Sequence, residues 1–85
     1  MFVYILYSSK TKKYYVGQTS NLEFRLLRHN GRKVKSTVSG VPWIMVKSIE
    51  VENRSKAVRL EKKIKGRGAK RFLESVNFDF TKFGM

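Results

Sequence analysis

The sequence lacks cysteine altogether, and long hydrophobic runs are missing as well. Without cysteine there is no disulfide framework, no thiolate nucleophile and no cysteine-based zinc site, so folding must rest on packing. The apolar run "FVYILY" at 2–7 is too short for a secretory signal and far too short for a membrane span. We therefore expect a soluble, cytoplasmic protein.

Acidic residues are also scarce. Six Asp and Glu stand against 19 Lys and Arg, which gives a formal charge of +13 on 85 residues. Such a charge opposes compaction, and it attracts polyanions because their counterions are released on binding. An anionic membrane is the competing partner, but no segment combines a Lys-rich face with a broad Leu and Phe face over several turns. The charge predicts a nucleic-acid-binding protein and no membrane association.

What the chain does contain is enough apolar material for one small core. Hydrophobic residues make up 41% of it and aromatic residues 13%, which is typical of a packed globule. No repeat, low-complexity tract or dividing linker is present. We expect one domain over residues 1–76, followed by a tail at 77–85 ("NFDFTKFGM") for which the sequence indicates no role.

Hydrophobic periodicity predicts the element order strand, strand, helix, strand, helix, helix. The strands are expected at 2–7, 14–18 and 43–51, and the first of them is apolar enough to be buried on both faces. A polar turn at 8–13 joins the first two strands as a hairpin.

The helices are expected at about 21–30, 56–65 and 69–76. Ser20 and Glu23 have the spacing of a capping box, and Ser55 is the expected cap of the second helix. Gly31 is a natural stop for the first helix, and "GRG" at 66–68 separates the other two. Residues 32–42 are rich in charge, Ser and Gly, which predicts a mobile basic loop.

Ionisable residues stand where apolar ones are expected on two of these helices. Arg25 and His29 lie next to Leu22 and Leu26 on the first helix, and Glu61 occupies an apolar position of the second. A partly buried charge is costly unless it is paired or used. On the helical patterns alone, the simpler explanation is a buried Arg25–Glu61 ion pair that joins the helices. The alternative is a functional site.

Two tyrosines make the functional alternative stronger. Tyr4 and Tyr15 lie on neighbouring antiparallel strands and can present their phenols to the same edge. Each alone is an ordinary strand residue. Gly17 removes a side chain where another group, such as a phosphate backbone, must come close.

The ordered set of motifs resembles the GIY-YIG nuclease superfamily, especially its small stand-alone members. "VYI" at 3–5 is similar to the first signature and "YVG" at 15–17 to the second. Gln18 follows at a position where some members carry a lysine. The resemblance covers about residues 2–75 and implies an α+β fold with a three-stranded antiparallel sheet flanked by helices, which agrees with the order ββαβαα expected from the pattern.

The resemblance also implies roles for five residues in metal-dependent hydrolysis of DNA phosphodiester bonds, in DNA repair or recombination. Glu61 would hold Mg²⁺ or Mn²⁺, and Arg25 would bind the scissile phosphate. Tyr4 or Tyr15 would activate water once nearby cations lower its pKa, and His29 would orient that tyrosine or relay its proton. The sequence leaves the choice between the two tyrosines open.

Basic residues outside this set are expected to contact phosphates with little sequence specificity. The expected DNA contacts are Gly17, Gln18, Arg32, Lys33, Lys35, Lys62, Lys63, Lys65, Arg67, Lys70 and Arg71.

Two other functions fit the same charge. One is a catalytically inactive nucleic-acid-binding module with the same fold. The other is an RNA-binding accessory protein, although most Tyr and Phe lie in apolar runs rather than at exposed stacking positions.

Overall fold

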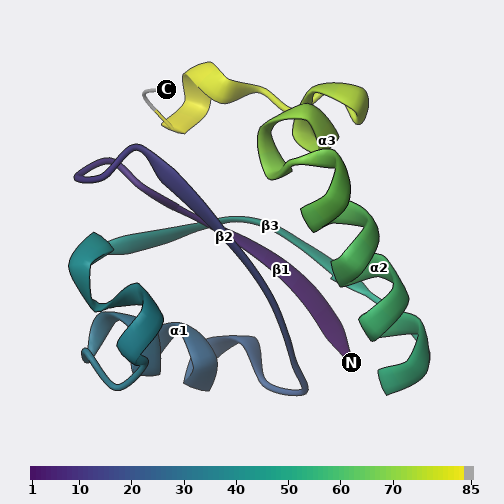
Figure 1. The fold of residues 1–85 in the computed structure, drawn as a ribbon, viewed down its shortest axis with the longest axis horizontal. Coiled ribbons are helices and arrows are strands. Elements are labelled where there is room, and N and C mark those ends of the chain that lie inside the picture. Colours follow the sequence, from purple (N-terminus) through teal and green to yellow (C-terminus); the bar gives the residue numbers. More distant parts are fainter. Residues whose placement is uncertain (84–85) are drawn as a thin grey trace.

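The computed structural model describes residues 1–83, which form a three-stranded antiparallel sheet with helices on both of its faces (Figure 1). The α+β class and the order ββαβαα are confirmed, and two short 3₁₀ helices are added. In chain order the elements are β1 (Phe2–Ser8), β2 (Lys13–Thr19), α1 (Leu22–Asn30), η1 (Lys35–Gly40), β3 (Trp43–Glu50), α2 (Arg54–Arg67), α3 (Ala69–Ser75) and η2 (Phe80–Phe83).

The first strand, β1, is the centre of the sheet, which has the order β2-β1-β3. Every residue from Val3 to Ser8 is buried, as the continuous apolar run predicted. In the register with β2, Tyr4 lies opposite Gly17 and Ile5 opposite Val16. Since successive side chains of a strand point to opposite faces, Tyr4 and Ile5 belong to different layers of the protein.

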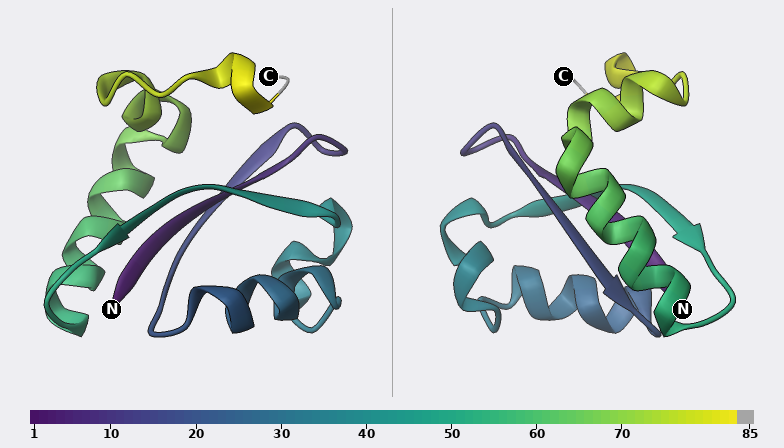
Figure 2. Two further views of the ribbon diagram at one scale, coloured as in Figure 1. Left: turned by 180° about the vertical axis from the view of Figure 1, so that it is seen from behind. Right: turned by 45° about the vertical axis from the view of Figure 1, so that its right-hand side comes forward.

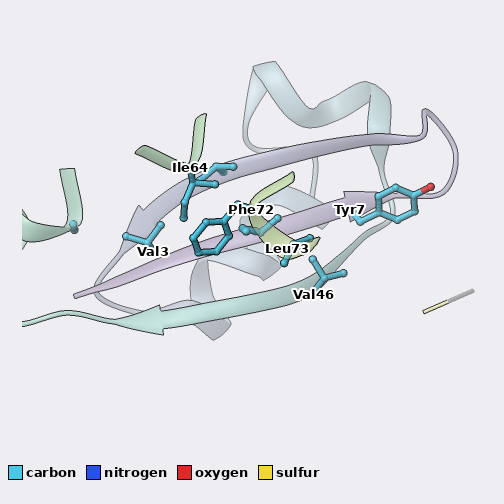
Figure 3. Close-up of a cluster of buried hydrophobic side chains, with 9 residues drawn as sticks. Val3, Tyr7, Val46, Ile64, Phe72 and Leu73 are labelled. Carbon is cyan, nitrogen blue, oxygen red and sulfur yellow. The ribbon is translucent and has the colours of Figure 1, made fainter. Parts of the chain in front are cut away.

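Each face of the sheet has its own core. Helices α2 and α3 cover one face, and α1 with η1 covers the other (Figure 2). The larger cluster lies under α2 and α3 and includes Val3, Tyr7, Val46, Ile64, Phe72 and Leu73 (Figure 3). The smaller cluster consists of Tyr4, Leu6 and Trp43, with Leu22 and Leu26 of α1 packed against it.

The described part of the C-terminal tail is integrated with the larger core. The Phe78 ring stacks on Phe83, with centroids 5.3 Å apart, and meets Phe80 edge-on at 5.1 Å. All three rings pack against the larger cluster. The tail therefore extends the core as far as Phe83, while residues 84–85 lie outside the described residues.

Both predicted helix caps are wrong, the first by one residue and the second by two. The Asn21 side chain accepts from the Phe24 N–H at 3.0 Å and begins α1, so the Ser20–Glu23 capping box is not formed. Asn53 does the same for α2 by accepting from Lys56 at 2.9 Å. Asparagine is as good a cap as serine, and each stands at the point where the chain turns from extended backbone into the helix.

The predicted mobile loop at 32–42 is also wrong, because its centre is the helix η1 packed against Trp43. The indole Nε1 donates to the Thr37 carbonyl at 2.7 Å. Gly40 is buried against the same ring, and a Cβ there would clash with it. Along the described chain, no helix has the length and apolar character needed to cross a membrane.

Candidate active site

Tyr4 is the centre of a polar group on the α1 face of the sheet. Its side chain is 0% exposed, and its phenol lies over Gly17 of the neighbouring strand. A Cβ at Gly17 would stand 2.5 Å from the Tyr4 hydroxyl oxygen. The close approach that the glycine permits is therefore that of the Tyr4 phenol.

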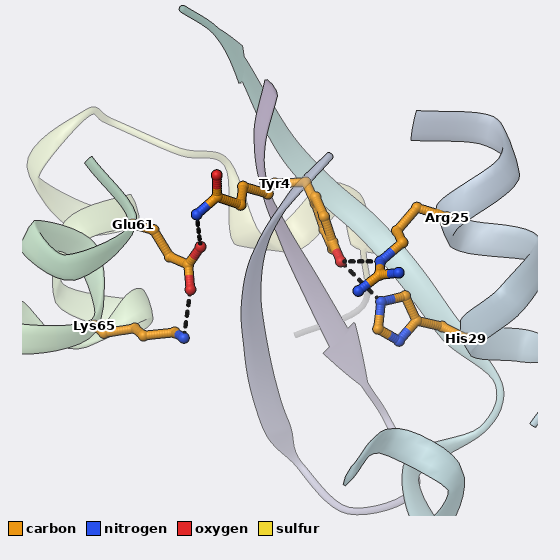
Figure 4. A network of polar contacts seen from close by, with 6 residues as sticks. Tyr4, Arg25, His29, Glu61 and Lys65 are labelled. Atoms are coloured by element: carbon orange, nitrogen blue, oxygen red, sulfur yellow. Dashed lines mark hydrogen bonds and ion pairs between the residues drawn. The ribbon is translucent and has the colours of Figure 1, made fainter. Parts of the chain in front are cut away.

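Helix α1 brings Arg25 and His29 to this phenol (Figure 4). The Tyr4 oxygen lies 2.9 Å from His29 Nε2, and Arg25 Nε donates to the same oxygen at 3.4 Å. The two helix residues are four positions apart and so lie on one face of α1. Of the five residues assigned from the family resemblance, Tyr4 thus contacts two others directly.

His29 is buried completely, and it is held at both ring nitrogens. Its Nδ1 lies 2.8 Å from Thr37 Oγ1, on the opposite side of the ring from Tyr4. Burial lowers the pKa of His29 below its ordinary value, and the charges of Arg25 and Arg28 lower it further. The imidazole is therefore neutral at neutral pH.

Burial has the opposite effect on Tyr4, whose pKa is raised. The Arg25 hydrogen bond lowers the pKa, but the loss of hydration outweighs it. For Tyr4, the expected net lowering of the phenol pKa by nearby cations is not found, although Arg25 acts in that direction. Arg25 itself has a raised pKa, mainly because of its hydrogen bond to Tyr4.

Tyr15 occupies the outer side of the same group. It lies on the edge strand β2 and is half-buried, unlike Tyr4. Its ring meets His29 edge-on with centroids 4.9 Å apart, and it lies 6.3 Å from the Tyr4 ring. A molecule approaching the β2 edge therefore reaches Tyr15 before it reaches Tyr4.

Glu61 is held on the other side of the edge strand. Its Oε1 accepts from Gln18 Nε2 at 2.9 Å, and its Oε2 pairs with Lys65 Nζ at 2.5 Å. In the part of the chain that the structure describes, no ion pair joins Glu61 to Arg25, so the structural explanation of these two charges does not hold. Figure 4 shows Glu61 and Lys65 on the α2 side of the strands and Tyr4, Arg25 and His29 on the α1 side.

Neighbouring residues of β2 connect these two parts. Gly17 lies under the Tyr4 phenol, and Gln18, the next residue, points to the other face and binds Glu61. The negative charge of Glu61 is within range of Tyr4 and raises the Tyr4 pKa slightly. The sequence-predicted residues therefore gather at one edge of the sheet from two helices that lie on opposite faces.

Sequence reasoning missed two residues that shape this site, Thr37 and Asn30, and one pairing, that of Lys65 with Glu61. Thr37 binds His29, and the Asn30 side chain ties the end of α1 to Trp43 through bonds of 2.6 and 3.1 Å to the Trp43 backbone. Neither has a local sequence signal, because each partner comes from tertiary structure. The partnership of Lys65 with Glu61 did have one, since residues four apart on a helix are neighbours.

Glu61 offers a single carboxylate to a divalent cation. Within residues 1–83 no group of three His, Cys, Asp or Glu could enclose a metal. Mg²⁺, however, is often held by one or two carboxylates and keeps several of its waters. Glu61 already binds the Lys65 ammonium group and the Gln18 NH₂ group. The Gln18 Oε1, at the other end of that amide, is buried and has no hydrogen-bond partner among the described residues. This oxygen is suited to a cation or to the water that a cation carries.

The expected DNA-contacting cations are exposed and lie on both sides of the sheet. A groove of about 440 Å³ runs between β2 and the junction of α2 with α3, and its lining includes Lys65, Lys70 and Arg71. The members on the α1 and η1 side are Arg32, Lys33 and Lys35, and those on α2 and α3 are Lys62, Lys63, Lys65, Arg67, Lys70 and Arg71.

Comparison with known proteins gives one match. A family model described as the GIY-YIG catalytic domain matches residues 1–74, which include every residue of the site. No curated protein and no solved structure matches the chain significantly.

Proposed function

The chain belongs to the GIY-YIG nuclease family, and from this premise we propose that it is a Mg²⁺-dependent DNA endonuclease. Family membership implies nuclease activity in general, whereas the metal, the DNA substrate and the residue roles are our proposal. The observation that carries the proposal is the convergence of Arg25, Tyr15 and Glu61 on the β2 edge, with Gly17 and Gln18 between them.

Arg25 is proposed to bind the scissile phosphate. One of its N–H groups, on Nε, is directed to Tyr4, which fixes the plane of the guanidinium. The other nitrogens can then donate to phosphate oxygens in a constant geometry. A cation placed in advance where negative charge grows is worth most in the transition state, since no reorganisation is needed during the reaction.

We assign removal of the proton from the attacking water to Tyr15. Tyr4 is the weaker candidate because it is 0% exposed and its hydroxyl already has two partners. Tyr15 is half-buried and borders both Arg25 and His29. Tyr4 and His29 then act as the support that holds Arg25 and the Tyr15 ring in place.

Glu61 and Gln18 are proposed to hold the cation. When bound there, Mg²⁺ would act as a Lewis acid that stabilises the negative charge of the leaving oxygen. Glu61 supplies the carboxylate, and Gln18 would supply its carbonyl oxygen once its amide turns so that Oε1 instead of Nε2 faces Glu61. Lys65 neutralises Glu61 until then, so the carboxylate keeps its orientation.

DNA is proposed to lie across the β2 edge. The basic groove beside β2 would take a phosphate backbone, and contacts to phosphates give affinity without sequence specificity. Because the family fold alone does not distinguish turnover from binding, the second candidate is a binding module without activity. The observation that favours it is the Lys65 ammonium on Glu61, which competes with any metal for the carboxylate.

Nicking of supercoiled plasmid with Mg²⁺ or with EDTA decides between the two candidates. The proposal expects nicking in Mg²⁺ only, its loss in Glu61→Ala and its retention in Glu52→Ala, the same change at an exposed carboxylate. Wild-type protein that binds DNA but never nicks it would establish the binding module instead. A branched duplex is tested in parallel, because preference for it would support a proposed role in DNA repair or recombination.

A further inference from the structure

We propose that Thr37 is a positioning residue of the site, which fixes the proton on one nitrogen of His29 and thereby orients Tyr4 toward Arg25. The inference rests on the proposed function for its catalytic consequence. The structural part of the inference, which is the position of one proton on His29, is independent of the proposed function.

Five groups form a continuous chain of hydrogen bonds, and the three in its middle are buried. Tyr4 and His29 are 0% exposed and Thr37 is 1% exposed, so water does not compete for their hydrogen bonds. The chain runs from Arg25 Nε to the Tyr4 oxygen at 3.4 Å and then to His29 Nε2 at 2.9 Å. It continues from His29 Nδ1 to Thr37 Oγ1 at 2.8 Å and from that hydroxyl to the Val34 carbonyl at 3.2 Å.

The Arg25 end of the chain favours one direction of the Tyr4 bond. A guanidinium only donates, so the Tyr4 oxygen is the acceptor of the Arg25 bond. The phenol proton then needs an acceptor of its own, and His29 Nε2 is the group within reach. A proton on Nε2 would leave the buried phenol oxygen facing two donors and its own hydrogen without a partner. Such a hydrogen is costly in a buried site.

The Thr37 end gives the same direction. The hydroxyl of Thr37 has one hydrogen, and the Val34 carbonyl accepts it. The oxygen can then accept from His29 Nδ1–H. The lowered pKa of His29 keeps its imidazole neutral, so only one of the two ring nitrogens carries a proton. If that proton is on Nδ1, Nε2 is free to accept from Tyr4. Every bond in the chain therefore runs from Arg25 toward Val34.

The consequence for the site is the orientation of Arg25. When His29 Nε2 carries no proton, the Tyr4 hydroxyl hydrogen points to His29. The lone pairs of the Tyr4 oxygen then face the Arg25 guanidinium. With the other tautomer, the Tyr4 hydrogen would turn toward Arg25 and repel the Nε–H group. Bonds aligned in one direction also polarise and strengthen one another.

The position of Thr37 is itself well fixed. Its backbone N–H donates to the Val34 carbonyl at 3.1 Å, and its own carbonyl accepts from the Trp43 indole at 2.7 Å. The short helix η1 is thus held against Trp43, and it places a hydroxyl behind His29 as the acidic residue of a catalytic triad does in other enzymes.

The experiment uses the fact that His29 is the only histidine in the chain. Long-range ¹H–¹⁵N NMR spectra of the full-length protein at neutral pH report which ring nitrogen is protonated, with one histidine to assign. The variants are Thr37→Val, which keeps the shape and removes the hydroxyl, and Thr37→Ser, which keeps the hydroxyl. The cleavage rate at saturating DNA and the KM for DNA are measured on the same three proteins.

We expect wild type and Thr37→Ser to carry the proton on Nδ1, and Thr37→Val to shift it toward Nε2. The cleavage rate should fall about tenfold or more in Thr37→Val and recover in Thr37→Ser, with KM unchanged, as for partners that orient other catalytic histidines. An Nε2 proton in wild type would overturn the inference without any variant. So would a Thr37→Val protein that keeps the wild-type tautomer, or one that changes tautomer and cleaves at the wild-type rate. A protein that does not cleave refutes the proposed function, and the NMR result still decides the tautomer.

Discussion

The two faces of the sheet bury different kinds of side chain. Under α2 and α3 the core cluster is hydrophobic throughout, from Val3 on β1 to Leu73 on α3. Under α1 the apolar cluster is much smaller, and His29 and Thr37 are buried beside it. One face resembles an ordinary protein core, and the other contains a chain of polar groups.

The difference indicates a division of labour. Apolar burial gives most of the favourable free energy of folding, so the α2 face is expected to carry stability. Buried polar groups add little net stability even when paired, but they hold donors and acceptors in fixed directions. The α1 face is therefore suited to positioning Arg25 and Tyr15, while Glu61 projects from the rim of the stabilising face.

The largest expected effect is a difference in cleavage rate between tyrosines on the two faces, for which three of the four tyrosines are compared. Tyr15→Phe removes the proposed base and should lower the cleavage rate by a factor of about 10² to 10⁴ with DNA binding unchanged. Tyr4→Phe should cost about tenfold, because it removes only the support of Arg25. Tyr7→Phe on the α2 face is the matched control and should cleave as wild type does. A larger loss in Tyr4→Phe than in Tyr15→Phe would reassign the base to Tyr4.

Truncating a core side chain on the α2 face should lower stability and leave the cleavage rate nearly unchanged. Ile64 is 0% exposed, and Ile64→Ala should lower the free energy of unfolding by about 2–5 kcal/mol. The cleavage rate per folded molecule should change little below the unfolding transition. Urea denaturation and single-turnover cleavage measure the two quantities. Loss of activity in a variant that is still fully folded would argue against the division of labour.

The decrease in the free energy of unfolding at mildly acidic pH should be caused by His29 on the α1 face. Because the pKa of His29 is lowered in the folded state, the unfolded chain binds the proton first, near pH 6.5. The free energy of unfolding should be highest above that pH. It should decrease as the pH falls toward the pKa of His29 in the folded protein, by at most about 1.4 kcal/mol per pH unit. Urea denaturation between pH 7.5 and 5 measures it. His29→Gln should remove this slope, and an equal slope in both proteins would refute the assignment.

The smallest effect concerns DNA binding on the two sides of the β2 edge. Lys33→Gln with Lys35→Gln, and separately Lys70→Gln with Arg71→Gln, should each weaken binding to all sequences alike. Each lost phosphate contact should reduce the slope of log K against log salt by about one unit. Lys10→Gln, at an exposed turn, is the control. An unchanged slope for the Lys33 and Lys35 pair would confine DNA to the groove beside α3.

Patterns within a single element predicted most of the fold. The apolar run at 2–7 identified the central strand, and the break at Gly68 separated the last two helices. The spacing of Tyr4, Tyr15 and Arg25 predicted a shared edge, because it depends only on hairpin register and helix periodicity.

Other features depend on contacts between segments far apart in the chain, which no local pattern encodes. Residues 32–42 look like a solvated loop until Trp43 packs over Gly40 and gives η1 a buried side. Gln18 is an ordinary strand residue until α2 places Glu61 next to it. The sign of the Tyr4 pKa shift likewise requires the burial of its hydroxyl, which the count of nearby cations does not reveal.

The central claim is that Arg25 on one face and Glu61 on the other act together as one site across the β2 edge. A double-mutant cycle of Arg25→Lys and Glu61→Gln, read as single-turnover rates of plasmid nicking in Mg²⁺, tests it directly. Residues that act as a unit are not additive, so we predict that the double variant is about as slow as the slower single variant. Losses that multiply, so that the double variant is slower than either single variant by the full factor of the other, would contradict a shared site.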